Sequence, residues 1–300
     1  MLQFLSDCSI ISIVFIILRL NNKKIKKKGA FTLVNLGFIG AGNMGSAIIK
    51  GVIAAQSSGE KNISIFAYDK DTSKLDALAE LGVNKCDDEA DVVKKCKYVL
   101  LAVKPQGIDA ALEAAAPFVN NDTVIISIAA GISEEYIKKM TIPDAKVVLV
   151  MPNTPLLLGE GASALAKAEP TTDEEFEFVK SIFASSGAAE VVPINKMKEI
   201  IAINGSSPAF IYLFAKGFTE YAKAVGIDDG AAMKLFAQSL IGSAKMLTDS
   251  GYTVDELIKM VSSPGGTTLA GLDEFYKGDL TGVVGKACES CTKRAYELSR

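Results

Sequence analysis

The sequence predicts an α/β domain followed by a domain made only of helices. From Phe31 onward, short β-branched runs alternate with segments of helical periodicity, which is typical of a parallel sheet flanked by helices. Several of these runs are apolar at both odd and even positions, as expected of parallel strands that are buried on both faces. Beyond Pro193 the strand signals fade, and long helical segments follow.

The length of the chain favours two domains. It has 300 residues, 49% of them apolar, which is more than one compact domain usually needs. We assign residues 31–192 to the α/β domain and residues 193–300 to the helical domain. Residues 1–30 form an extension that we expect to be disordered and unused by the fold.

The extension does not have the pattern of a membrane span or a secretory signal. Its apolar stretch, residues 9–18, is too short to cross a bilayer, and the basic run at residues 23–28 follows it rather than precedes it. We therefore expect a cytoplasmic protein without stable membrane insertion. A weak association with a membrane surface stays an alternative.

Charge and side-chain chemistry argue against several functions. The formal net charge of −3 and the pI of about 5.3 argue against a nucleic-acid partner, because such proteins usually display clustered basic residues. Histidine is absent, which removes the commonest general base and metal ligand. The five cysteines are scattered, as expected of reduced intracellular thiols. Cys288 and Cys291 form a C-x-x-C, but two further soft ligands are missing, so we predict no metal site.

The predicted elements follow the chain in order. Strong strands are expected at residues 33–39, 63–68, 98–103, 123–128 and 146–151, and weaker ones near 162–166 and 189–192. Helices of the second domain are expected at residues 197–225, 228–250, 253–262, 269–277 and 281–298. An apolar face on the helix at 228–250 either packs a core or joins a second copy of the chain, and we expect a homodimer.

A glycine-rich turn, Gly40-Ala41-Gly42-Asn43-Met44-Gly45, lies between the first predicted strand and a helical segment. In that context the spacing G-x-G-x-x-G indicates a dinucleotide site. Gly40 permits a tight turn, Gly42 lets the backbone approach a pyrophosphate, and Gly45 lets the helix lie close to the strand. The helix N-terminus supplies free amide groups and the positive end of a dipole.

The end of the second predicted strand bears on the choice of cofactor. Asp69 lies near the place where such folds contact the adenosine ribose. A carboxylate there accepts a hydrogen bond from a ribose 2′-hydroxyl and repels a 2′-phosphate, whereas Lys70 beside it does the reverse. The sequence therefore predicts NADPH or NADH and leaves the choice open. Lys70 and Asp71 are equally well explained as a solvated turn with a helix cap.

Three later loops follow strands at the same edge of the predicted sheet, where open α/β sheets bind ligands. They contain Val103-Lys104-Pro105, Ala129-Ala130-Gly131 and Asn153, which lies between two prolines. The amide of Asn153 is able to meet a nicotinamide or a substrate, although an asparagine that caps a turn is the commoner case.

Two motifs stand out in the helical half. Gly205-Ser206-Ser207-Pro208-Ala209 lies inside a predicted helix, and Ser262-Ser263-Pro264-Gly265-Gly266-Thr267-Thr268 precedes another. The second motif suits an anion, because glycines followed by threonines at a helix start expose backbone amides and hydroxyls to a carboxylate. A plain helix-capping turn is the alternative.

Together the motifs FIGAGNMG, AVKP, SIAAG, MPNTP, GSSPAF and SSPGGTT resemble the pyrroline-5-carboxylate reductase family in order and spacing, over about residues 33–300. The resemblance implies a Rossmann-type dinucleotide-binding domain and a helical dimerisation domain that completes the active site, with dimers often built into larger rings. It also implies NAD(P)H-dependent reduction of the C=N bond of 1-pyrroline-5-carboxylate to L-proline, the last step of proline synthesis.

The resemblance also implies site residues by position. Beside Asp69 and Lys70, the cofactor contacts carried over are Gly40, Ala41, Gly42, Asn43, Met44, Val103, Lys104, Pro105, Ala129, Ala130 and Asn153. The substrate carboxylate is expected against Gly266, Thr267 and Thr268, with the helix of Ser207 behind them. The absence of histidine fits, because a cyclic imine protonates readily in solution. We predict no obligatory side-chain acid and a hydrogen bond from Thr268 to the ring nitrogen.

The chain departs from the family pattern in three respects. GSSPA replaces the usual GSGPA, Asp69 stands where many members have a neutral or basic residue, and the extension has no counterpart. A β-hydroxyacid dehydrogenase is the nearest rival, but it needs a lysine followed four residues later by asparagine in a glycine-rich helix, which this chain does not offer. A cofactor-binding sensor without turnover is a second rival, and it would have no reason to keep the SSPGGTT motif.

Overall fold

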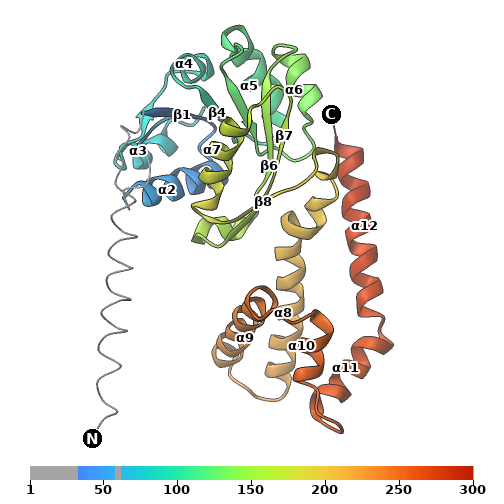
Figure 1. The fold of residues 1–300 in the computed structure, drawn as a ribbon. Coiled ribbons are helices and arrows are strands. Elements are labelled where there is room, and N and C mark those ends of the chain that lie inside the picture. The colour runs from blue at the N-terminus through green and yellow to red at the C-terminus, as the bar shows by residue number, and fades with distance from the viewer. Residues whose placement is uncertain (1–32, 58–61, 300) are drawn as a thin grey trace, which may run out of the picture.

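The first half of the chain forms one eight-stranded sheet (Figure 1). The computed structural model describes residues 33–57 and 62–299, so the prediction for residues 1–30 lies outside the described residues. The strand order is β3-β2-β1-β4-β5-β6-β7-β8. The strands are β1 (Val34–Ile39), β2 (Ile63–Tyr68), β3 (Asn84–Lys85), β4 (Tyr98–Leu101), β5 (Val124–Ser127), β6 (Lys146–Met151), β7 (Gly161–Ala168) and β8 (Gly187–Val191).

Helices cover both faces of this sheet and enclose two apolar cores. One face is covered by α2 (Asn43–Ser57), α3 (Ser73–Ala79) and α7 (Asp173–Ala184), and the other by α4 (Glu89–Lys95), α5 (Ile108–Ala115) and α6 (Glu134–Met140). Successive strand residues alternate between the cores, so that Phe38 faces one and Ile39 the other. This burial on two faces explains why the strands are apolar at both parities.

The sheet is parallel, as predicted, except at one edge. β1 to β6 are parallel, but β7 runs antiparallel to β6, and β8 pairs parallel with β7. Only residues 152–160 connect β6 to β7, and a parallel crossover needs about a dozen residues or more. The strong and weak strands were otherwise found near their predicted positions, whereas the two-residue strand β3 was missed.

The remainder of the chain is helical, as predicted. It contains α8 (Ser207–Ala224), α9 (Asp229–Asp249), α10 (Val254–Met260), α11 (Thr267–Lys277) and α12 (Leu280–Leu298). The prediction of one helix over residues 197–225 is wrong, because a π-helix, Ile201–Gly205, precedes α8. Pro208 lies in the first turn of α8, where its missing N–H removes no helical hydrogen bond. Short 3₁₀ helices complete the fold at Pro105–Gly107, Ala116–Phe118, Thr154–Leu158 and Ile194–Lys196.

The helical domain leads away from the sheet and returns to it. α8 runs outward, α9, α10 and α11 lie at the far end, and α12 brings the chain back beside the sheet (Figure 1). An aromatic cluster joins α8, α9 and α11: the ring centroids of Phe218 and Phe236 are 4.3 Å apart, and those of Phe214 and Phe275 are 5.9 Å apart. Within the described part of the chain, no helix has the length and apolar character to span a membrane.

Candidate cofactor and substrate sites

The glycine-rich turn after β1 has the conformation that its sequence predicts. Gly40 has φ 103°, and a Cβ there would lie 2.7 Å from the carbonyl of Ala102 on the neighbouring strand segment. A Cβ on Gly45 would lie 2.5 Å from the carbonyl oxygen of Gly40, so the first turn of α2 packs directly on the loop. A Cβ on Gly42, in contrast, would meet no described atom within 4 Å. Gly42 therefore faces open space beside the N-terminus of α2, where a phosphate can approach the backbone.

Asp69, directly after β2, is tied to this turn. Its Oδ2 accepts the N–H of Ala41 at 2.7 Å, and its Oδ1 accepts the N–H of Asp71 at 2.9 Å and Nζ of Lys74 at 3.0 Å. The side chain is 11% exposed. Burial acts to raise the pKa of Asp69, but these three donors outweigh it and lower the pKa below its ordinary value. The carboxylate is thus a fixed negative charge at neutral pH.

A crevice of about 260 Å³ opens between the glycine-rich turn and the carboxyl ends of β2 and β4. We call it the glycine-rich crevice. It brings together six of the predicted cofactor contacts: Gly40, Gly42, Asp69, Lys70, Val103 and Lys104. It also contains Lys74 and Glu89, which sequence reasoning missed. Lys74 could have been found as the basic residue in the first turn of α3, whereas nothing local marks Glu89.

The remaining predicted contacts from the same loops have other surroundings. Ala41 is buried, and its N–H is used by Asp69. Asn43 and Met44 begin α2; Asn43 is exposed, and Met44 is partly buried against a core. Pro105 is exposed at the start of a 3₁₀ helix.

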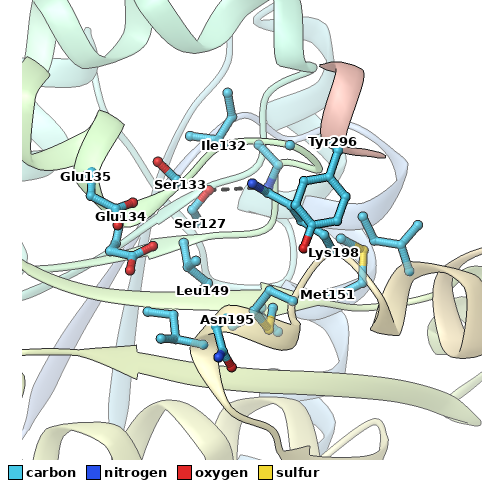
Figure 2. Close-up of a pocket in the computed structure, with 16 residues that line it drawn as sticks. Ser127, Ile132, Ser133, Glu134, Glu135, Leu149, Met151, Asn195, Lys198 and Tyr296 are labelled. Carbon is cyan, nitrogen blue, oxygen red and sulfur yellow. Dashed lines mark hydrogen bonds between the residues drawn. The ribbon is translucent and has the colours of Figure 1, made fainter. Parts of the chain in front are cut away.

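A second cavity, of about 370 Å³, lies beyond the carboxyl end of β5 and is shown in Figure 2. Ala129 lines it, and Ala130 is exposed beside it, so neither residue lies in the glycine-rich crevice. Figure 2 shows Glu134 and Glu135 on one side, with Lys198 and Tyr296 on the other. Burial and the neighbouring carboxylate raise the pKa of Glu134. The cavity was missed because distant segments, including α12, form its wall.

Asn153 forms part of a buried joint between the two halves of the chain. Its side chain is 8% exposed; Oδ1 accepts the N–H of Ala162 at 2.8 Å, and Nδ2 donates to the carbonyl of Asn204 at 3.2 Å. Asn204 lies in the π-helix, and its Nδ2 donates in turn to the carbonyls of Met151 and Ala162 at 2.7 and 3.2 Å. We call Asn153 and Asn204 the asparagine joint. Sequence reasoning placed Asn153 at the nicotinamide and did not single out Asn204.

The predicted carboxylate site lies at the far end of the helical domain. α11 begins at Thr267, after Gly266 and after Gly265, which has φ 70°. Within the described residues no side chain caps this helix start, and Thr267 and Thr268 are exposed. Figure 1 shows α11 remote from the sheet, so one chain does not bring Thr268 to its own glycine-rich crevice. Ser207 is the first residue of α8 and lines the apolar groove along α8 and α12.

The helical domain exposes an unusual amount of apolar side chain. Among the described residues of α8 to α12, the buried ones are Pro208, Ala222 and Ala295. A groove of about 830 Å³ runs along α8 and α12, and its apolar lining includes Phe210, Leu213, Phe214, Tyr221, Val283 and Val284. Leu213 is 69% exposed and Tyr221 67% exposed. Apolar surface of this extent marks an interface with another protein surface.

Comparison with known proteins agrees with both halves of the structure. Residues 195–298 match the family model described as pyrroline-5-carboxylate reductase dimerisation, and residues 35–131 match the one described as NADP oxidoreductase, coenzyme F420-dependent. A pyrroline-5-carboxylate reductase of Methanosarcina acetivorans is 33% identical over 265 residues, covering 88% of this chain and 98% of the relative. That of Escherichia coli K12 is 32% identical over 266 residues, covering 88% and 98%.

Solved structures give the same result. The pyrroline-5-carboxylate reductase of Coxiella burnetii superposes with a TM-score of 0.81 at 30% identity, covering 89% of this chain and 99% of that one. The Plasmodium falciparum enzyme with NADP bound superposes with a TM-score of 0.78 at 27% identity, covering 91% and 100%. The glycine-rich crevice, the dimerisation-type helices and these full-length matches lead to one conclusion. The chain belongs to the pyrroline-5-carboxylate reductase family.

Proposed function

We propose that the protein reduces 1-pyrroline-5-carboxylate to L-proline with a reduced nicotinamide cofactor. The observation that supports this most strongly is the combination, in one chain, of the glycine-rich crevice with an uncapped helix start at Gly266-Thr267-Thr268. The first suits a dinucleotide pyrophosphate and the second a substrate carboxylate. Relatives that match nearly their full length are named for this reaction.

The cofactor, when bound, supplies the hydride, and the protein supplies position and charge. Gly40, Gly42 and the start of α2 would hold the pyrophosphate, and Val103 and Lys104 would flank the cofactor at the same edge of the sheet. Backbone amides at the start of α11 would hold the substrate carboxylate, and the Thr268 hydroxyl oxygen would accept the N–H of the protonated ring nitrogen. Because the imine protonates readily in solution, alignment and exclusion of water are the main contributions asked of the side chains.

A homodimer would complete the site. The start of α11 lies at the far end of the helical domain, remote from the sheet that carries the glycine-rich crevice, and the exposed apolar faces of α8 and α12 favour a second copy. A partner that covers these faces would bring its own Thr268 toward this chain's crevice.

The proposal has three further parts. They are larger rings of dimers, a domain boundary after residue 192 and a cytoplasmic location. The free thiols of Cys86, Cys96, Cys288 and Cys291 support that location.

The test is turnover by the purified full-length protein. Oxidation of NADH or NADPH that depends on added pyrroline-5-carboxylate, with proline as product, supports the proposal. Binding of the cofactor without turnover on this or any other cyclic imine contradicts it and favours a sensor.

The role of Thr268 has its own variant. Thr268→Val should lower kcat, because the isosteric side chain loses the hydroxyl. Thr248→Val is the matched control, since Thr248 is exposed on α9 and bonds only to its own helix among the described residues. Normal turnover of Thr268→Val at saturating substrate excludes the hydrogen bond to the ring nitrogen.

A further inference from the structure

Asp69 lies where the cofactors NADH and NADPH differ. The two cofactors differ only at the 2′ position of the adenosine ribose, which carries a hydroxyl in one and a phosphate in the other. In sheets of this type the ribose lies at the carboxyl end of the second strand, beside the glycine-rich turn. Asp69 follows β2 directly, lines the glycine-rich crevice and contacts the turn through Ala41.

The hydrogen bonds of Asp69 leave it able to accept one more donor but unable to move aside. Each carboxylate oxygen has about two acceptor sites. Among the described residues, Oδ1 already accepts two donors, and Oδ2 accepts one, the N–H of Ala41. Oδ2 therefore retains a place for the 2′-hydroxyl of the ribose. To admit a phosphate, Asp69 would have to release Ala41 and so loosen the turn that holds the pyrophosphate.

The lysines near Asp69 do not neutralise its negative charge. Nζ of Lys74 lies 3.0 Å from Asp69 Oδ1 and 3.9 Å from Asp71 Oδ2, so its charge is shared between two carboxylates. Lys70 lines the crevice as well, but so does the carboxylate of Glu89, which is 8% exposed. A 2′-phosphate would meet the carboxylates of Asp69 and Glu89 here, and the carboxylate of Asp69 is held by three hydrogen bonds.

We infer that Asp69 makes this chain an NADH-preferring enzyme, by accepting the ribose 2′-hydroxyl and excluding a 2′-phosphate. The inference rests on the proposed function for the reaction, but it concerns a residue that acts on the cofactor alone.

The experiment compares the two cofactors in wild type, Asp69→Asn and Asp69→Ser. Both kcat/KM with pyrroline-5-carboxylate and the equilibrium affinity for NAD⁺ and NADP⁺ are measured for each protein. Wild type should favour NADH by about tenfold or more, on the scale of one well-placed polar contact. Both substitutions should move the ratio toward NADPH by a similar factor, and Asp69→Asn keeps an acceptor for Ala41. Asp71→Asn is the matched control, because Asp71 lies in the same turn but does not line the crevice. Its ratio of kcat/KM for NADH to kcat/KM for NADPH should stay within about threefold of the wild-type ratio.

The outcomes separate this inference from the reaction itself. Faster turnover of wild type with NADPH overturns the inference and leaves the reaction in place. An equal loss with both cofactors in Asp69→Asn also overturns it, because the carboxylate would then serve only the turn. Absence of turnover with both cofactors contradicts the proposed reaction, and the NAD⁺ and NADP⁺ affinities then still decide whether Asp69 selects the cofactor.

Discussion

Replacing Asn153 by alanine distinguishes a structural role from a cofactor contact. The substitution removes the acceptor for the Ala162 N–H, at 2.8 Å, and the donor to the Asn204 carbonyl, at 3.2 Å. Each hydrogen bond contributes about 1 kcal/mol net, and a buried group left without a partner costs roughly 1–3 kcal/mol more. We therefore expect the free energy of unfolding to fall by about 3 kcal/mol.

Thermal and urea unfolding measure this loss. For a chain of this size, 3 kcal/mol corresponds to a decrease in Tm of roughly 6–12 °C. Protomer concentration must be held constant, because association stabilises the folded chain. Thr154→Ala is the matched control: Thr154 is the exposed neighbour in the same motif, and its Tm should change by less than about 2 °C.

Steady-state kinetics of the same variant test the alternative, a contact with the cofactor. If Asn153 contacted the nicotinamide instead, Asn153→Ala would raise the KM for the cofactor or lower kcat while Tm stayed unchanged. That result would refute the reasoning from the asparagine joint. Asn204→Ala should act in the same direction as Asn153→Ala, because it removes donors to the carbonyls of Met151 and Ala162.

Three further predictions follow from single side chains. Gly42→Ala should leave Tm unchanged but weaken cofactor binding by about tenfold or more, roughly 1.4 kcal/mol, because its Cβ meets only the space for the pyrophosphate; an unchanged affinity by titration would contradict this. Glu175 is buried, yet Lys146 at 2.8 Å and Lys97 at 2.9 Å lower its pKa from 4.5 to about 2. The ionised carboxylate should contribute on the order of 3 kcal/mol to the free energy of unfolding above pH 4.5, and this contribution should be lost as the pH falls toward 2. In Glu175→Gln, the free energy of unfolding measured in urea should therefore depend less on pH in this range. A dependence as steep as that of wild type would count against this role. Leu213→Arg should dissociate the proposed dimer and so lower the sedimentation coefficient, whereas Lys216→Arg on the same helix should leave it unchanged. An unchanged sedimentation coefficient for Leu213→Arg would show that this face of α8 is not the interface.

The sequence predicted most of the sheet because local patterns determine it. β2 and β6 have the predicted bounds: β6 is a β-branched run buried on both faces, and β2 alternates buried with partly buried residues. The direction of β7 was not predictable from its own residues, because it depends on the length of the connection before it. Gly40 and Gly42 of the glycine-rich crevice were found by a spacing that has a direct physical reason, whereas Lys74 and Glu89 were not found.

The remaining site residues were harder to place because they depend on tertiary contacts. Asn153 follows a strand, as ligand-binding residues often do, but its amide is used by Ala162 and by the backbone of Asn204, which lies far along the chain. Lys198 and Tyr296 meet only because α12 returns to the sheet. α11, which carries Thr268, is remote from the sheet within one chain, so the proposed role of Thr268 depends on the proposed dimer.

The π-helix at Ile201–Gly205 takes up one residue more than an α-helical turn holds. In a regular α-helix, one residue added or removed turns everything after it by about 100°. A π-turn absorbs its extra residue within the turn, so the helix that follows stays nearly in phase. Deleting one residue from this segment would therefore let it relax to α-helical hydrogen bonding and leave the side chains of Leu213 and Tyr221 pointing in nearly their present direction. The chain can thus change by one residue here without turning the apolar side of α8 away.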